Sequence, residues 1–298
     1  METEDVEFFG AGVRLSGTIT VPSRASALPG VVLIGGSGPS DRHNGGFFDL
    51  LRDHLANAGV AVLAYDKRGA GWSAGDWPVA TVDDLAADAA AAVAVLQAHP
   101  QVTRGTVGVL GHSEGGWVAL RVCAKLGTPR HLIINSCPAV SFAESEVHAL
   151  TGAGAEQDTA AALFQQLTDA AQAGLGYREG ERILAACQHE PWYPAAAAGG
   201  FSLDAAAWSQ LGAWGHYDPR ADLDQLTTPT LAIFGSDDLL VPIHASIQRL
   251  RESAEQTARP QQITVFPGAG HRLQAGTGPA PGYLDCLSAW CRTPRIRP

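Results

Sequence analysis

The sequence predicts an α/β protein with a doubly wound, mostly parallel sheet and a helical insertion between two of its late strands. Short, continuously apolar runs alternate with amphipathic stretches, as in parallel strands that are buried on both faces and joined by helices. The alternation breaks between residues 141 and 215 and then resumes. With 298 residues, the chain is long enough to bury a substantial core.

The elements of this sheet are expected in a definite order. Residues 6–21 alternate apolar and polar side chains over much of their length, which predicts an antiparallel hairpin leading into the sheet. Continuously apolar runs predict buried strands at residues 29–35, 60–65, 106–111, 131–136, 230–234 and 262–266. Helical patterns predict helices at residues 47–58, 80–96, 243–253 and 282–291, and one directly after residue 113.

We therefore expect a core made of residues 1–140 and 216–298. Residues 141–215 hold Ala-rich stretches, loops and no strand-like run, so they are expected to form a helical unit inserted between two strands. The sequence contains no internal repeat.

Composition excludes several classes of partner. The formal net charge of -10 argues against nucleic acid and against an anionic membrane surface. The N-terminus is acidic and lacks the pattern of a signal peptide, and no apolar run is long enough to span a bilayer. The five cysteines show no Cys-x-x-Cys spacing, which favours reduced structural thiols in a cytoplasmic protein. The sequence specifies no oligomeric state.

One stretch indicates catalytic chemistry. An apolar run ends in Gly-His-Ser-Glu-Gly at residues 111–115, and a helical pattern follows at once. A Gly-x-Ser-x-Gly motif between strand and helix is typical of a nucleophile elbow, a strained turn that exposes the serine hydroxyl. The amides at the start of the helix can stabilise negative charge beside it. Ser113 is therefore the candidate nucleophile; its alternative role is that of a simple helix N-cap.

A second match to the motif competes with the first. Residues 71–75 read Gly-Trp-Ser-Ala-Gly, but they follow a loop and run into Trp77-Pro78, with no strand before them and no helix after them. We expect Ser73 to lie in a structural turn.

A serine nucleophile needs a base, and the base needs an acid that orients it. Functional groups collect at the carboxyl ends of parallel strands. Asp238 follows the expected strand 230–234, and His271 follows the expected strand 262–266. The order Ser113, Asp238, His271 is the order of an α/β-hydrolase triad. Asp237 shares the turn with Asp238, but the spacing Gly-x-x-Asp-x-x-Val-Pro favours Asp238.

These motifs resemble the α/β-hydrolase superfamily, and in particular bacterial esterases with a Gly-Ser-Gly-Pro-x-Asp-Arg loop, which is Gly-Ser-Gly-Pro-Ser-Asp-Arg here at residues 36–42. The resemblance implies an oxyanion hole made by the backbone amides of Ser37 and Glu114. This sequence departs from the family's pattern at Gly35, where the family commonly has a histidine. The resemblance also implies that residues 141–215 form a cap over the strand ends.

Aromatic residues gather in the expected cap: Trp192, Tyr193, Trp208 and Trp214. They can form an apolar pocket wall for a bulky acyl group. They can equally form the small core of the cap itself, because a small subdomain needs large side chains to be stable. The sequence leaves both interpretations open.

The predicted function is that of a serine hydrolase that cleaves a small to medium apolar carboxylic ester or lactone. The same triad also serves peptidases, amidases, thioesterases, acyltransferases and cyclases. A ligand-binding protein that has lost turnover has no need of Asp238 or His271. We expect no metal and no cofactor, because the sequence has no His-Glu-x-x-His motif, no clustered His/Cys spacing and no phosphate-binding loop.

Overall fold

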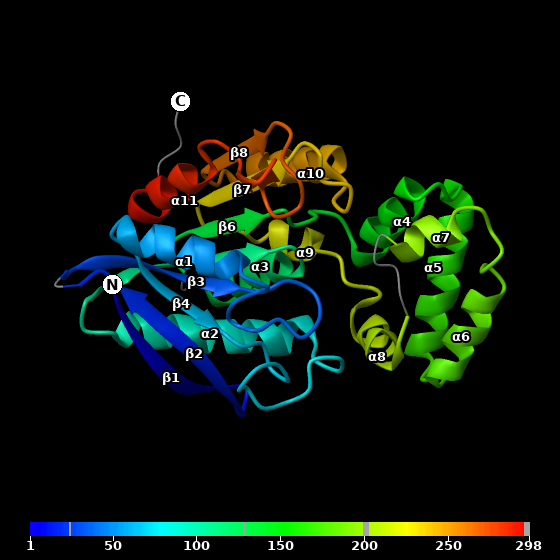
Figure 1. Ribbon diagram of the computed structural model, residues 1–298, viewed down its shortest axis with the longest axis horizontal. Coiled ribbons are helices and arrows are strands. Elements are labelled where there is room, and N and C mark those ends of the chain that lie inside the picture. The colour runs from blue at the N-terminus through cyan, green and yellow to red at the C-terminus, as the bar shows by residue number, and fades with distance from the viewer. Residues whose placement is uncertain (24, 128, 199–202, 295–298) are drawn as a thin grey trace.

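An eight-stranded sheet forms the centre of the molecule (Figure 1). The computed structural model describes the chain except for residues 24, 128, 199–202 and 295–298. The strand order is β1-β2-β4-β3-β5-β6-β7-β8, with β1 and β2 antiparallel to their neighbours and all other pairs parallel. The predicted α/β fold with its N-terminal hairpin is therefore confirmed. The strands are β1 (Glu2–Gly10), β2 (Val13–Val21), β3 (Leu28–Ile34), β4 (Ala61–Tyr65), β5 (Val102–His112), β6 (Leu132–Asn135), β7 (Thr230–Gly235) and β8 (Gln261–Phe266).

Helices cover both faces of this sheet, because its central strands are apolar on both sides. Val32 and Ile34 of β3 pack into one core and Val31 and Leu33 into the other, as the alternation of side chains along a strand requires. Four helices pack on the first face: α2 (Val82–Ala98), α3 (Glu114–Leu126), α9 (Arg220–Leu223) and α10 (Ile243–Thr257). Two helices pack on the second face: α1 (Phe47–Asn57) and α11 (Tyr283–Arg292).

The segment between β6 and β7 is helical. It holds α4 (Phe142–Gly152), α5 (Gln157–Gln172), α6 (Tyr177–Ala185), α7 (Tyr193–Ala198) and α8 (Ala205–Trp214). Ser141 caps the first of these helices, since its hydroxyl accepts the Glu144 amide and the Glu144 carboxylate accepts the Ser141 amide. The helices share a hydrophobic core of their own and stand together at one end of the sheet (Figure 1).

The sequence patterns missed some small elements. A two-stranded hairpin, β9 (Gln274–Ala275) with β10 (Gly278–Pro279), follows β8, and the four-residue helix α9 precedes β7. Each is too short to give a periodic signal. Within the described part of the chain, no helix is long and apolar enough to cross a membrane.

Candidate active site

Ser113 lies in a sharp turn between β5 and α3. Its φ of 54° and ψ of -128° are rare for a residue with a side chain. The motif glycines make the turn possible: a β-carbon on Gly111 would lie 2.1 Å from the Gly115 carbonyl oxygen, and one on Gly115 would lie 2.3 Å from the Ile34 carbonyl oxygen. The turn is held by a 3.0 Å hydrogen bond from the Ser113 amide to the Asn135 carbonyl oxygen. The turn at Ser113 between β5 and α3 thus has the strained geometry that the Gly-x-Ser-x-Gly motif predicts.

The two strand-end residues meet beside this turn. Nδ1 of His271 lies 2.8 Å from Oδ2 of Asp238, whose side chain is fully buried. The other carboxylate oxygen of Asp238 accepts the Leu240 amide at 2.9 Å, which fixes the carboxylate plane. Asp237 is exposed and accepts the Ser236 hydroxyl instead. The contact to His271 therefore belongs to Asp238.

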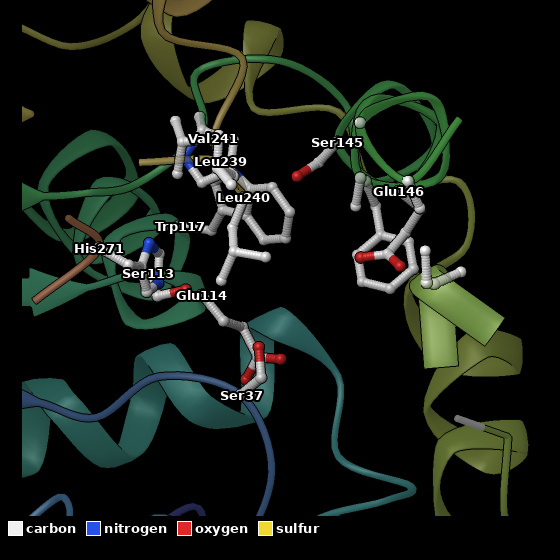
Figure 2. Close-up of a pocket in the computed structure, with 17 residues that line it drawn as sticks. Ser37, Ser113, Glu114, Trp117, Ser145, Glu146, Leu239, Leu240, Val241 and His271 are labelled. Carbon is white, nitrogen blue, oxygen red and sulfur yellow. The ribbon is translucent and has the colours of Figure 1, made fainter. Parts of the chain in front are cut away.

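His271 also lies next to the elbow. Its ring centroid is 4.9 Å from that of His112, the residue before Ser113. Ser113 and His271 line the same pocket, and Figure 2 shows their side chains together at its inner end. The structure thus brings together the three residues of the predicted triad. His112 is buried, and burial, together with the nearby His271, lowers its pKa to about 3, so its imidazole is neutral at pH 7.

The glycine-rich loop after β3 lies against the elbow. A β-carbon on Gly36 would lie 3.3 Å from Cβ of Ser113, and Ser37 lines the same pocket as Ser113. Glu114, the first residue of α3, lines it as well. Both predicted oxyanion residues, Ser37 and Glu114, therefore line the pocket together with Ser113 (Figure 2).

Arg42 anchors this loop to the neighbouring one. Its guanidinium donates to both carboxylate oxygens of Asp66, at 3.1 and 2.8 Å, and its amide donates to the same carboxylate. Burial alone would raise the pKa of Asp66, but the hydrogen bonds from Arg42 and from the Trp72 amide together hold this pKa below its usual range. The fork geometry of arginine suits such a bidentate contact.

Ser73 takes part in the same anchor. Its hydroxyl donates to the Asp66 carbonyl oxygen at 2.6 Å and accepts the Ser16 amide at 2.9 Å. It lies in the turn after β4, outside the pocket that Ser113 lines. The second Gly-x-Ser-x-Gly match is thus a structural turn whose serine links β2 to the loop after β4.

The pocket above Ser113 has a volume of about 450 Å³. Its walls come from the sheet edge and from α4 and α7 of the helical segment, with only a few polar side chains (Figure 2). Besides Ser37, Ser113, Glu114 and His271, the residues around it are Trp117, Pro138, Phe142, Ser145, Glu146, Ala149, Gly152, Ala153, Ala195, Ala196, Leu239, Leu240 and Val241.

The structure does not bring the four predicted aromatic residues to this pocket. Trp192 and Trp208 are buried in the core of the helical segment, and Tyr193 packs on Trp192 with ring centroids 5.8 Å apart. The Trp208 indole donates to the Leu175 carbonyl oxygen at 2.9 Å. This placement corresponds to the alternative interpretation, in which large side chains supply the core of a small helical unit.

Trp214 does not line the pocket either, and it lies outside the core of the helical segment. It packs into the main core, only 1% exposed, and its indole donates to the Ala80 carbonyl oxygen at 2.9 Å. Its ring lies 6.1 Å from that of Trp117, which does line the pocket. The aromatic walls are thus Phe142 and Trp117, which is the second residue after the elbow motif, and the sequence patterns predict neither of them for the pocket.

Glu146 is a further pocket residue that the sequence patterns do not predict. It lies on α4 and faces the pocket (Figure 2), and within the described part of the chain its carboxyl group has no hydrogen-bond or ion-pair partner. Burial, with a smaller contribution from Glu114, raises the pKa of Glu146 to about 7. No pattern in the sequence distinguishes it from the exposed acidic residues of neighbouring helices.

Cys137, two residues after the end of β6, is fully buried against Gly116 of α3. Burial raises its pKa well above the usual value, as burial also raises the pKa of Cys123 and Cys291 to about 12. Such thiols stay protonated and unreactive near neutral pH. Among the described residues, no group of three or more His, Cys, Asp or Glu side chains is placed to hold a metal ion.

Known proteins resemble this chain in sequence and fold. The chain is 28% identical over 227 residues to a non-heme haloperoxidase of Rhodococcus erythropolis, an alignment that covers 74% of this chain and 78% of that protein. It is 31% identical over 115 residues to esterase EstD of Thermotoga maritima, covering 37% of this chain and 27% of EstD.

Solved structures share the whole fold. The esterase Pf2001 of Pyrococcus furiosus superposes with a TM-score of 0.65 at 18% identity, over 97% of this chain and 89% of that one. The family model described as "Serine aminopeptidase, S33" matches residues 41–276, most of the chain. The protein belongs to this family of α/β-hydrolases and is a hydrolase.

Proposed function

We propose that the protein is a serine carboxylesterase that works through an acyl-enzyme on Ser113. The observation that carries the proposal is the 2.8 Å contact between His271 and the buried Asp238, beside a pocket that Ser113 lines. A carboxylate on Nδ1 leaves Nε2 of the imidazole to accept a proton. The esterase relatives support the same activity.

The reaction proceeds in two halves. His271 takes the proton of the Ser113 hydroxyl as the oxygen attacks the ester carbonyl carbon, and the carbonyl oxygen becomes an oxyanion that the Ser37 and Glu114 amides bind. The carbon–oxygen bond to the alcohol then breaks, and His271 gives its proton to the departing alcohol. Water attacks the acyl-enzyme by the same route, and the acid and the free serine are restored.

The shape of the pocket supports an apolar acyl or alcohol group of moderate size. A cavity of about 450 Å³ is in the range of small-molecule sites, and aromatic and aliphatic side chains make up most of its walls. Residues 141–215 act in this proposal as the cap, because Phe142, Ala149 and Ala196 of that segment complete the cavity.

The test is covalent labelling with a fluorophosphonate and hydrolysis of p-nitrophenyl esters of increasing acyl length. We expect wild-type protein to be labelled once and Ser113→Ala not at all. Ser73→Ala is the matched control, since it changes the serine of the other Gly-x-Ser-x-Gly motif, and it should be labelled like wild type. Equal labelling of Ser113→Ala and wild type would remove the nucleophile assignment.

An aminopeptidase is the second candidate, and one observation favours it. The carboxyl group of Glu146, which has no partner among the described residues, faces the pocket and can bind the α-ammonium group of an aminoacyl substrate. The description of the matched family names this activity. Aminoacyl p-nitroanilides and p-nitrophenyl esters should be compared directly: faster turnover of the anilides, lost in Glu146→Gln, would replace the esterase proposal.

A further inference from the structure

A buried lysine joins the two segments that carry the proposed oxyanion amides. Lys67 follows β4 and its side chain is 7% exposed. Its ammonium group donates to the Gly36 carbonyl oxygen and, at 2.9 Å, to Oε1 of Glu114. Its backbone amide donates to the Ser40 carbonyl oxygen at 3.0 Å, so it is fixed to the glycine-rich loop at both ends.

The acceptor on Gly36 belongs to the peptide group whose N–H is that of Ser37. A trans peptide is planar, with its carbonyl and N–H on opposite sides, and none of the described peptide bonds is cis. A cation bound to the oxygen therefore fixes the plane and turns the Ser37 N–H away from Lys67. It also polarises the amide, which strengthens the N–H as a donor.

Glu114 completes the arrangement from the other side. Its side chain, 3% exposed, binds Lys67, while its backbone N–H is the second proposed oxyanion donor. Its other carboxylate oxygen accepts Nε2 of Gln210, on α8 of the helical segment, at 2.5 Å. A chain of contacts thus runs from the Gly36–Ser37 peptide through Lys67 and Glu114 to the cap.

We propose that Lys67 is a positioning residue that orients and polarises the Gly36–Ser37 peptide for oxyanion binding, and that Gln210 connects this arrangement to the cap. The inference rests on the proposed function, because it requires an oxyanion to form at these amides. Lys67 itself lies behind the peptide, so its effect reaches the reacting atoms only through Gly36 and Glu114.

The decisive variant is Lys67→Met combined with Glu114→Gln, which removes both charges and leaves neither buried alone. We expect kcat for a p-nitrophenyl ester to fall by about 10- to 100-fold, somewhat less than the loss of an oxyanion donor itself. KM should change by less than about threefold, since the ester in its ground state has no oxyanion to bind.

A transition-state analogue gives a readout that a structural role would not move. Ser113 adds to the carbonyl carbon of a trifluoromethyl ketone, its proton passes to His271, and the ketone oxygen becomes an oxyanion. The inhibition constant of the ketone should rise in proportion to the loss of kcat. The affinity of the matching secondary alcohol, which forms no oxyanion, should stay the same.

The matched control is a second buried ion pair, between Arg68 of the same loop and Asp88 of α2, whose Nε and Oδ2 atoms are 2.7 Å apart. Arg68→Met with Asp88→Asn should lower thermal stability comparably, yet leave kcat within about threefold of wild type. Gln210→Leu is a milder change that keeps the ion pair. It should lower kcat and the affinity for the ketone by the same factor, about 3- to 10-fold. This variant decides the matter if the double variant does not fold.

Two results would overturn the inference. One is a folded Lys67→Met/Glu114→Gln variant with wild-type kcat; the other is a loss of kcat with unchanged affinity for the ketone. Failure of the proposed function looks different, because wild-type protein would then neither hydrolyse esters nor label at Ser113. In that case the positioning role falls with it.

Discussion

The hydroxyl of Tyr283 donates a 2.8 Å hydrogen bond to Oδ1 of Asn135, across 148 residues of sequence. Both side chains are fully buried. Asn135 ends β6, and its carbonyl oxygen accepts the Ser113 amide and lies 3.2 Å from Nδ1 of His112. The last helix of the chain thus supports the elbow through a single asparagine.

Tyr283→Phe should therefore destabilise the fold more than it impairs activity. The change leaves Oδ1 of Asn135 buried without its donor, which costs about 1–3 kcal/mol. Denaturant unfolding should show this loss, with kcat reduced by less than about fivefold, because the backbone bond from Ser113 to Asn135 remains. An unchanged free energy of unfolding would show that Asn135 finds another donor.

Asp238→Asn should reduce kcat by orders of magnitude, about 10⁴-fold in the comparable triad variant, because an amide cannot hold the imidazole in the required tautomer. Asp237→Asn, the matched control in the same turn, should stay close to wild type. Steady-state hydrolysis of one p-nitrophenyl ester by both variants is sufficient. Loss of activity in the Asp237 variant alone would show that Asp237, and not Asp238, is the acid of the triad.

The triad could be predicted from sequence because each of its residues has a local signal. Ser113 lies between a strand pattern and a helix pattern, and Asp238 and His271 each follow an apolar run of strand length. In a parallel sheet, such positions converge without any knowledge of side-chain packing. The fold and the arrangement of these three residues follow from the same strand pattern.

The pocket walls have no local signal of this kind. Trp208 and Phe142 both lie in the helical segment, and only the packing of the helices decides which ring faces its core and which faces the cavity. Lys67 reads as an ordinary loop residue, since its acceptor on Gly36 is 31 positions away. Contacts between distant loops depend on the complete tertiary structure.

Phe142 lines the pocket and Trp208 lies in the core of the helical segment, and a comparison of Phe142→Ala with Trp208→Phe tests this difference in role. Removing the Phe142 ring from the pocket should lower kcat/KM for long acyl chains about tenfold, with a smaller effect on acetate esters. Trp208→Phe loses the bond to the Leu175 carbonyl oxygen and should cost about 1 kcal/mol of stability at unchanged acyl preference. A shift in acyl preference in the Trp208 variant would show that Trp208 contributes to the substrate pocket.

Glu146 should make the protein less stable as the pH rises. Its pKa is raised from the usual 4.5 to about 7, so between these values the folded protein holds a proton that the unfolded chain has lost. Stability then decreases as pH rises through this window, and the full cost of the charged carboxylate is present above it. Glu146→Gln should therefore be more stable than wild type at pH 8, by about 3 kcal/mol, and equal to it near pH 4.

Thermal unfolding of both proteins at pH 4, 6 and 8 checks this expectation. Glu179→Gln is a control of opposite sign, because the hydrogen bond from Arg182 on α6 lowers the pKa of Glu179. A Glu146→Gln variant that is less stable than wild type at pH 8 would show that the carboxylate has a favourable partner there.

His131 should have the opposite dependence on pH. It is fully buried directly before β6, and neither ring nitrogen has a hydrogen-bond partner among the described residues. Burial, with a smaller contribution from Arg130, lowers its pKa from 6.5 to about 3. Between pH 6.5 and about 3, the imidazole of His131 is therefore protonated in the unfolded chain and neutral in the folded protein. Stability falls as the pH drops through this range.

His131→Leu removes this titration without removing a hydrogen bond. Between pH 7 and pH 4 the wild-type protein should lose about 3 kcal/mol through His131, at about 1.4 kcal/mol per pH unit, and the variant should lose correspondingly less. His112, whose pKa is also lowered to about 3, keeps its own contribution in both proteins. Denaturant midpoints at several pH values measure the slope, and equal slopes for variant and wild type would show that the imidazole is protonated in the folded protein.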